Sequence, residues 1–514
     1  MTEKTPEPKF GSSLKWQSVN VTVQVVLQLG FIAALARLIP TEAFGIMAIA
    51  LVVVGFVEIF AQVGIGPALI QNPNVTTEHR RTAFVFSLGL GIIFFAGTYF
   101  AAPAVAELYN QPLLTEVLRW ISLSFIISGA YVVPRSMLIK KMQFKYLFLC
   151  SSTAMIFGNL IIGLSLAANG AGIWAYVAAL LTQNTLLGIG YWIASPGPVS
   201  LKLNKVALRE MVGYGGRSTV FNMINYAAGK IDTMVVGVQT TDWTLTGFYD
   251  RSAYLMGLPV TVLGKLGDSV LFSGMAMMQS DLERLRRTVL YSVHAVSLFV
   301  IPLTVFLILR AKEVTVLLLG SSFLEATPIV TILFSCVALR SFIKIGDATM
   351  RATDRLKVGA IIKLGFLFAV GLGSWWAMTS SGGGGEGNVI KVAWAVAFAT
   401  ALQTIAVAAW MVWGMQINFV GLIRRILPGL VLGVAVLIGA YLLIFIPEVK
   451  NYSNSLMPEV INAINISIHL ATSMIVAAIM IIAYPKIIDG GDDVMRKKLF
   501  GKLRNGKLKS RLTI

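Results

Sequence analysis

The sequence predicts an all-α polytopic membrane protein, because its composition, its long apolar segments and the placement of its positive charges all indicate that class. Of the 514 residues, 56% are hydrophobic and 13% are charged, and the mean hydropathy is +0.77. Soluble domains carry about 25% charged residues, so a soluble multidomain enzyme is excluded. In so apolar a chain, the net charge of +18 indicates basic cytoplasmic loops rather than a nucleic-acid partner.

Fourteen segments of the chain are long and apolar enough to cross a bilayer. A membrane-spanning helix needs about 20 mainly apolar residues, because the hydrocarbon core is roughly 30 Å thick. The segments cover residues 14–39, 43–67, 82–106, 114–137, 147–168, 171–194, 209–237, 245–275, 287–310, 326–348, 357–379, 389–413, 421–446 and 461–484. We expect two six-helix lobes around a central cavity, at 14–194 and 209–413, and two more helices at 421–484.

The distribution of positive charge orients these helices. Cytoplasmic loops of membrane proteins carry an excess of lysine and arginine. With the N-terminus in the cytoplasm, 29 of the 42 basic residues fall on the cytoplasmic side and six fall outside. The expected protein is therefore multi-pass, with residues 1–13 and the basic residues 486–514 as cytoplasmic tails. The basic tail is expected to lie along anionic membrane lipids.

Two distant parts of the chain resemble each other. Gly45 follows a Thr-Glu turn and Gly247 follows a Thr-Asp turn, at an offset of 202 residues. Further along the same helices, Gly64 matches Gly267. Parallel repeats of this kind occur in transporters whose two halves start on the same side of the membrane. The pattern therefore supports two related lobes.

Charged and polar side chains interrupt three of the segments at helical spacing. In residues 209–237 they recur every three or four positions and so share one helix face. Residues 245–275 and 326–348 carry similar stripes. A charge at the centre of a membrane helix costs about 2.5–3.5 kcal/mol, so these faces should meet protein or water. The bases expected to line the cavity are Arg217, Lys230, Arg251, Lys265, Arg340 and Lys344.

An excess of bases inside the bilayer suits an anionic substrate, in particular a phosphate. Arginine binds phosphate oxygens in a bidentate manner, and lysine binds them as a point charge. Two pairs, Asp250–Arg251 and Asp347–Arg351, are alternatively structural ion pairs at helix ends. Lys363 is expected to extend to the cytoplasmic surface.

Three acids within the predicted helices are candidates for ion or proton coupling, with helix packing as the alternative. They are Glu58, Asp232 and Asp268. The two cysteines and three histidines are scattered along the chain, so neither a metal site nor a disulfide framework is expected. No cofactor is expected.

Three stretches resemble the bacterial polysaccharide flippases (Wzx type) of the multidrug/oligosaccharidyl-lipid/polysaccharide exporter superfamily, in the exopolysaccharide and colanic-acid branch. They are GSSLKWQSVN with LARLIPTEAFGIMAIA, KIDTMVVG with LTGFYDRSAYLMGLPV, and LFSCVALRSFIKIGDATMRATDR. The similarity covers essentially all fourteen segments. TMVVG departs from the Asn-Leu-Leu-like run that relatives often carry there, and the stretch Gly382–Gly387 is inserted.

The resemblance implies a non-enzymatic, alternating-access transporter of the bacterial inner membrane. It would move an undecaprenyl-diphosphate-linked oligosaccharide repeat unit from the cytoplasmic to the outer leaflet for polysaccharide biosynthesis. The six bases would hold the diphosphate, and a polysaccharide polymerase and the export machinery would be partners. The residues implied to contact the sugars are Gln24, Asn222, Asn225 and Tyr254.

Two other functions stay open at this point. A cation-coupled multidrug exporter would share the architecture, although the excess of bases argues against a cavity for cationic drugs. A membrane polysaccharide polymerase or ligase would use the same lipid donor. Such an enzyme needs a large outer loop with catalytic residues, and the predicted outer loops are short.

Overall fold

The described part of the protein is entirely helical. The computed structural model describes residues 10–61, 65–72, 74–197, 203–267, 281–380, 385–442 and 466–468, and it has no strand among them. The chain divides into two compact units. Unit 1 comprises Met1–Ser252, Leu318–Glu325 and Lys363–Val396, and unit 2 comprises Ala253–Leu317, Ala326–Ile362 and Ala397–Ile514. The predicted lobes at 14–194 and 209–413 have different boundaries, and the two-lobe division stays a prediction.

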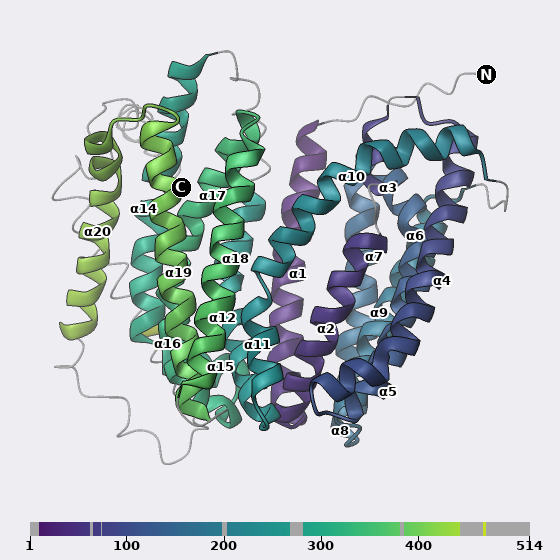
Figure 1. The fold of residues 1–514 in the computed structure, drawn as a ribbon, viewed down its shortest axis with the longest axis horizontal. Coiled ribbons are helices and arrows are strands. Elements are labelled where there is room, and N and C mark those ends of the chain that lie inside the picture. Colours follow the sequence, from purple (N-terminus) through teal and green to yellow (C-terminus); the bar gives the residue numbers. More distant parts are fainter. Residues whose placement is uncertain are drawn as a thin grey trace, which may run out of the picture. The chain divides into compact units, whose positions relative to one another are not determined.

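Unit 1 is a helical bundle in which α4 packs along α6, α6 along α9, and α1 along α7 (Figure 1). Its helices are α1 (Phe10–Leu38), α2 (Thr41–Ala61), α3 (Ile65–Gln71), α4 (Thr77–Leu108), α5 (Leu113–Ile121), α6 (Leu123–Lys140), α7 (Phe144–Met155), η1 (Ile156–Gly163), α8 (Leu164–Ala168), α9 (Ile173–Ala194), α10 (Lys205–Ala228), α11 (Ile231–Gln239) and the start of α12 (Trp243–Gly267). The 3₁₀ helix η3 (Ser321–Ala326) and parts of α18 (Leu356–Thr379) and α19 (Glu386–Trp413) complete it.

Several predicted helices are broken into two elements. The segment predicted at 114–137 consists of α5 and α6, which meet at Ser122. The segment at 147–168 contains the π-helix η1, and the segment at 209–237 is interrupted between α10 and α11 at Gly229 and Lys230. π-Helical turns are frequent at functional sites.

Polar residues at two helix starts join α10 to the first part of unit 1. Thr76 caps α4 in a capping box with His79, whose Nε2 contacts Glu210 Oε2 at 3.1 Å. Asn204 caps α10 by accepting from the backbone of α10, and its Nδ2 donates to Glu78 at 2.8 Å. α10 also packs on α2, α3 and α4. The segment that sequence assigns to the start of the second lobe thus lies in unit 1.

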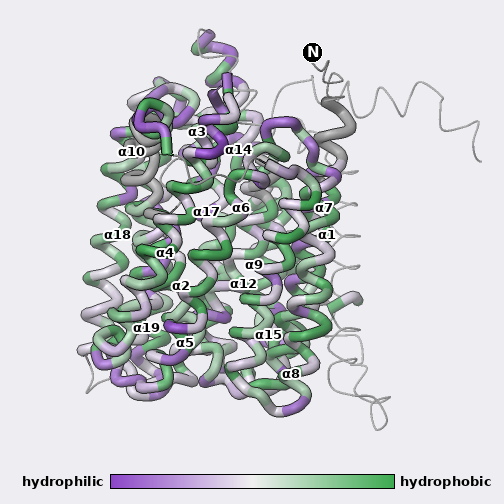
Figure 2. The backbone as a smooth tube through the Cα atoms, turned by 90° about the vertical axis from the view of Figure 1, so that its right-hand side faces the viewer, coloured by the Kyte–Doolittle hydropathy of each residue, from purple (hydrophilic) through white to green (hydrophobic). Residues whose placement is uncertain are grey.

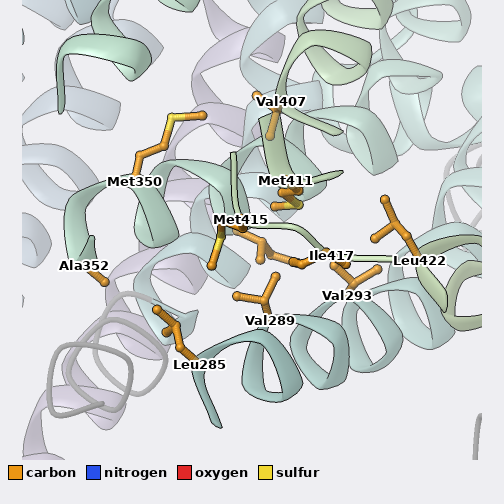
Figure 3. Packing of buried hydrophobic residues seen from close by; sticks show 11 residues of the cluster. Leu285, Val289, Val293, Met350, Ala352, Val407, Met411, Met415, Ile417 and Leu422 are labelled. Carbon is orange, nitrogen blue, oxygen red and sulfur yellow. The ribbon is translucent and has the colours of Figure 1, made fainter. Parts of the chain in front are cut away.

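Unit 2 is built around an apolar core of Leu285, Val289, Val293, Met350, Val407, Met411 and neighbouring side chains (Figure 3). Its helices are α14 (Leu282–Leu309), α15 (Ala311–Leu319), α16 (Thr327–Phe334), α17 (Cys336–Ala352) and α20 (Phe419–Leu442), with parts of α12, α18 and α19. The sulfur-containing and branched side chains of α14, α17 and α19 interdigitate there.

A close joint attaches α20 to α14. Pro428 removes one backbone donor from α20, and the carbonyl of Arg425 accepts from His294 Nδ1 at 3.1 Å and from Ser297 Oγ at 3.0 Å. At Gly429 the two backbones approach so closely that a Cβ atom would collide with the carbonyl oxygen of Ser297. The joint therefore combines inter-helix hydrogen bonds with a small residue, as is common in membrane bundles.

Gly429→Ala is expected to destabilise the protein by about 1–3 kcal/mol, because the added methyl group overpacks this joint. The measurement is the thermal melting of the purified protein followed by tryptophan fluorescence. Gly421→Ala on the same helix is the control, since the nearest atom to its added Cβ is 3.7 Å away. Equal melting temperatures for the two variants would contradict the close approach.

The described helices fit a membrane, although the predicted number is not reproduced. Ten are long and apolar enough to span a bilayer, or 11 if the bent pair Ser321–Phe334 and Cys336–Ala352 counts as one span. α10 and α12 are helical but too polar to be counted, and most of 461–484 lies outside the described residues. Figure 2 shows hydrophilic residues gathered mostly towards the helix ends. Exposed tryptophans such as Trp376, at 69%, fit a bilayer interface.

The glycines that the repeat aligns lie against each other's helices. A Cβ atom on Gly45 of α2 would collide with the carbonyl oxygen of Trp243, and one on Gly247 of α12 would collide with that of Thr41. The same offset of 202 residues relates both members of each contact. We call this contact the α2–α12 crossing. It lies at the helix ends that the charge distribution places outside.

Candidate functional site

Unit 1 contains a polar cavity of about 320 Å³, which we call the unit 1 cavity. Helices α1, α2, α4, α6, α7 and α9 contribute its side chains. Its polar lining comprises Asn20, Gln24, Glu58, Ser87, Ser128, Tyr131, Arg135, Ser151, Gln183 and Tyr191. Two of these, Gln24 and Glu58, are residues that the sequence singles out.

The lining residues extend from the predicted cytoplasmic helix ends to the middle of the bundle, where Gln24 and Gln183 lie. Glu58, Arg135 and Tyr191 each lie within about one and a half turns of the end of their helix. The ends of α2, α6 and α9 are those that the charge distribution places in the cytoplasm. The unit 1 cavity is therefore closer to the predicted cytoplasmic side than to the α2–α12 crossing.

Hydrogen bonds hold the amides of α1 in place. Gln24 Nε2 donates to Ser151 Oγ at 3.0 Å, and Ser151 Oγ donates to Asn20 Oδ1 at 3.0 Å. Asn20 and Gln24 are four residues apart and so lie on one face of α1. This relay joins α1 to α7 across the wall of the cavity.

Two tyrosines and two opposite charges complete the lining. The rings of Tyr131 and Tyr191 meet edge to face, with centroids 5.6 Å apart. Glu58 and Arg135 both act electrostatically on Tyr131. The lining thus carries one acid and one base, and it has no excess of either charge.

A second polar cluster of unit 1 is centred on the buried carboxylate of Asp250, which pairs with two basic side chains. Asp250 is 4% exposed and Arg251 is 4% exposed, and the guanidinium of Arg251 donates two hydrogen bonds to the carboxylate. Lys230 Nζ lies 3.5 Å from the other carboxylate oxygen. The guanidinium carbon of Arg251 also lies 5.1 Å from the ring centroid of Phe44. This geometry matches the alternative prediction of a structural pair for Asp250 and Arg251.

Three aromatic rings pack together at the predicted outer side of unit 1. Phe323 is fully buried, with its ring centroid 5.6 Å from that of Phe44 and 5.6 Å from that of Phe248. Phe44 and Phe248 each lie beside a glycine of the α2–α12 crossing. This aromatic cluster therefore lies beside the α2–α12 crossing, and none of its three rings lines the unit 1 cavity.

The acid predicted at Asp232 is buried within α11. It is 6% exposed, and its carboxylate accepts from the backbone of Thr233 and from the hydroxyl of Tyr249, both at 2.8 Å. A carboxylate in the first turn of a helix is stabilised by the helix dipole. These contacts give Asp232 a structural role in joining α11 to α12.

The prediction that Lys363 extends to the cytoplasmic surface is wrong. Lys363 is 7% exposed within unit 1, and its Nζ donates to Asn225 Oδ1 at 2.8 Å. Burial of a lysine head group requires polar partners, and α10 supplies one. The predicted sugar contact Asn225 thus also fixes α18 to α10.

The other residues predicted to bind substrate or to couple ions lie either in unit 2 or at positions that the structure does not describe. Arg340 and Lys344 are one turn apart on α17, with Lys344 exposed and Arg340 half-buried, and Tyr254 is half-buried on α12. The side chains of Arg217, Asn222 and Lys265 and the whole of Asp268 lie outside the described residues.

Sequence reasoning missed most of the unit 1 cavity. Arg135 counted only as a basic residue of a cytoplasmic loop, and Gln183 lies in a four-residue polar stretch of α9 that belongs to a predicted membrane span. The signal available was that six different helices carry polar residues in the half nearer the predicted cytoplasmic ends, with Ser128, Tyr131 and Arg135 at helical spacing on α6. No group of three or more histidine, cysteine, aspartate or glutamate side chains that would hold a metal occurs among the residues described.

Solved structures with similar folds are membrane transporters. The lipid II flippase MurJ in an inward closed conformation superimposes with a TM-score of 0.70 at 14% identity, over 92% of this chain and 99% of that one. A multidrug resistance MATE family transporter in an inward-facing conformation gives 0.64 at 14% identity, over 79% and 98%. At this identity the likeness shows the fold, which is that of the MurJ and MATE transporters.

Curated relatives are proteins of polysaccharide assembly. The lipopolysaccharide biosynthesis protein WzxC of Escherichia coli is 22% identical over 339 residues, 64% of this chain and 67% of the relative. The teichuronic acid biosynthesis protein TuaB of Bacillus subtilis is 21% identical over 404 residues, 78% and 81% of the two chains. These relatives confirm the resemblance that the sequence motifs indicate.

A family model described as polysaccharide biosynthesis protein matches residues 34–328, more than half of the chain. The match includes the unit 1 cavity helices from α2 to α9 and both glycines of the α2–α12 crossing. The chain therefore belongs to this family of polysaccharide biosynthesis proteins.

Proposed function

We propose that the protein flips undecaprenyl-diphosphate-linked oligosaccharide repeat units from the cytoplasmic to the outer leaflet of the bacterial inner membrane. The unit 1 cavity carries the proposal, because it is a polar space inside a bundle of apolar helices. Unpaired polar groups cost several kcal/mol in hydrocarbon, so a sugar head group needs such a space to cross a bilayer. Family membership and the MurJ-like fold support the same function.

Alternating access is the mechanism that we propose. In it, the cavity is loaded from the cytoplasm while the outer side is closed, and the α2–α12 crossing then separates to release the head group outside. Its position on the predicted outer side supports this role. Fourteen transmembrane helices with both termini in the cytoplasm remain part of the proposal.

The diphosphate is proposed to bind basic residues that no buried pair occupies. Arg340 and Lys344 share one face of α17, and Lys344 is exposed. Lys230 is a third candidate, because its side chain is 37% exposed although it contacts Asp250. Arg217 and Lys265 remain candidates from the sequence alone. Arg251 is left out, since burying its guanidinium against Asp250 removes it from substrate.

Coupling to protons or sodium is proposed to act through Glu58. Its carboxylate lines the unit 1 cavity, whereas Asp232 is enclosed by hydrogen bonds within its own helices. Sugar contacts are proposed for Gln24, Asn222, Asn225 and Tyr254, as the family resemblance implies.

Arg340→Ala and Lys344→Ala are each expected to slow translocation of the lipid-linked glycan about tenfold or more, because each removes a charged hydrogen bond to phosphate. The measurement is the appearance of the glycan on the outer surface of proteoliposomes containing the purified protein. Arg355→Ala, which removes an exposed base at the end of the loop after α17, is the control.

Different outcomes separate the alternatives. Normal translocation by both variants would remove the diphosphate assignment and leave the transport function standing. Drug extrusion by the wild-type protein without glycan translocation would instead support a multidrug exporter. Glycan extension without a change of leaflet would support a polymerase or ligase.

A further inference from the structure

We infer that the unit 1 cavity is a binding site for the sugar rings of the substrate, separate from the bases proposed to hold the diphosphate. The inference rests on the proposed function for its role in transport. The binding step itself can be tested with sugars that carry neither lipid nor phosphate.

The chemistry of the lining suits a carbohydrate. Sugar hydroxyls both donate and accept hydrogen bonds, and the amides of Gln24 and Gln183 do the same, while Ser151 Oγ, whose proton goes to Asn20, keeps a lone pair to accept one. Because Glu58 and Arg135 are the only charged side chains among the described lining residues, that part of the lining has no excess of either charge. A diphosphate would need several bases, and a lipid tail would need apolar walls. Neither matches this lining.

The two tyrosines provide an apolar surface within this polar lining. Tyr131 and Tyr191 form an edge-to-face pair, with rings inclined at 67°. Such a pair presents one ring face and one hydroxyl-bearing edge to the same space. The C–H face of a sugar packs on an aromatic ring while its hydroxyls reach the amides.

The polar groups are held in position before any ligand arrives. Gln24 and Asn20 are linked through Ser151, which limits their rotation. The backbone that carries Gln183 is closely packed, because a Cβ atom on Gly158 of the π-helix η1 would lie only 2.7 Å from the Gln183 nitrogen. The π-helix thus sets α9 closely against α7. Preorganisation of this kind lowers the entropic cost of binding.

Size and depth agree with a sugar that enters from the cytoplasm. A volume of about 320 Å³ is near the lower limit of small-molecule pockets, which span roughly 300–1,000 Å³, and so suits one or two sugar rings rather than a whole repeat unit. The lining reaches from the predicted cytoplasmic helix ends into the middle of the bundle, so a sugar can enter it from the side on which the proposed substrate is loaded. The cavity would hold part of the glycan while the rest stays outside it.

Saturation-transfer NMR on the full-length protein in lipid nanodiscs tests this site. The probes are glucose, galactose, N-acetylglucosamine and glucuronic acid, with inorganic pyrophosphate as competitor. Gln183→Ala and Ser151→Ala are each expected to weaken sugar binding about tenfold, the effect of losing one well-placed hydrogen bond. Pyrophosphate is expected not to displace the sugar.

Matched controls lie on the same helices. Thr185→Ala is two residues from Gln183 on α9, and Thr153→Ala is two residues from Ser151 on α7; both threonines are exposed and bond to their own helix. Both controls are expected to bind like the wild type. Should Gln183→Ala fail to fold, as judged by size-exclusion chromatography, Ser151→Ala carries the test.

Three results would overturn the inference: no probe sugar binds the wild-type protein, the cavity variants bind like their controls, or pyrophosphate displaces the sugar. These results leave the proposed function standing if the wild-type protein still translocates lipid-linked glycan. Conversely, sugar binding without translocation by the wild-type protein would refute the proposed function and leave the binding site intact.

Discussion

Gly45→Ala or Gly247→Ala is expected to force α2 and α12 apart and to reduce glycan translocation. Each added methyl group would collide with a backbone carbonyl, and a carbonyl within a helix cannot move aside as a flexible side chain can. Overpacking of this kind costs about 1–3 kcal/mol, which shifts a two-state equilibrium by roughly tenfold or more. The closed outer side would therefore be populated less in both variants.

Labelling of one buried position measures this shift. Thr246 is fully buried beside Gly247, so a cysteine placed there by Thr246→Cys reacts with an impermeant maleimide only when the crossing opens. The two natural cysteines, Cys150 and Cys336, are first replaced by serine. We expect labelling to rise about tenfold in the glycine variants.

Gly30→Ala is the control for the glycine variants, because no atom lies within 4 Å of its added Cβ. It should label and transport like the wild type. If Gly45→Ala and Gly247→Ala also behave like the wild type, the crossing is not a gate, and the outer side must open elsewhere.

Asp250→Asn is expected to destabilise the protein by about 3–5 kcal/mol. The change leaves the buried guanidinium of Arg251 without its negative partner, and an uncompensated buried charge is strongly unfavourable. Lys230 loses the same partner, at 3.5 Å. Thermal melting in detergent measures the effect, with Glu283→Gln as control. That change breaks exposed pairs, so we expect a loss of less than about 1 kcal/mol.

A double variant decides between a structural and a substrate-binding role for Arg251. Asp250→Asn combined with Arg251→Gln removes both charges and is expected to recover much of the lost stability. Normal glycan translocation by the double variant is the expected result for a structural pair. A stable double variant that no longer translocates glycan would return Arg251 to the diphosphate site.

The polar stripes predicted from helical spacing identified which charged residues share a helix face. They did not identify where in the bundle that face lies. In unit 1, Asp250, the first residue of the α12 stripe, is buried and paired with Arg251 and Lys230. Lys363 lies two turns into α18, where a lysine commonly reaches the membrane surface, yet Asn225 holds it inside. Helical periodicity reports which residues share a face. It does not report which neighbouring helix covers that face.

The unit 1 cavity shows that helical periodicity also fails to indicate which helices bring their polar residues together. Gln24 and Glu58 were apparent because they follow regular stripes on their own helices. Ser128, Tyr131 and Arg135 follow a similar stripe on α6, but they lie in a segment that otherwise reads as an apolar membrane span, and Gln183 and Tyr191 lie two turns apart on α9. They converge only because α6, α7 and α9 pack with their predicted cytoplasmic ends together.

Hydropathy alone predicted a helical membrane protein, motif-bearing stretches predicted its family, and the internal repeat singled out two glycines; the orientation that charge indicates stays a prediction. These properties depend on how a segment interacts with the bilayer or on which residue types follow one another, so they can be predicted from the sequence of single segments. Packing alone decided that Arg251 is buried with Asp250, that Lys363 turns inward, and that Gly45 and Gly247 meet opposing backbones. The reason is physical: burial and pairing depend on side chains contributed by other helices, and their distances are absent from any single stretch of sequence.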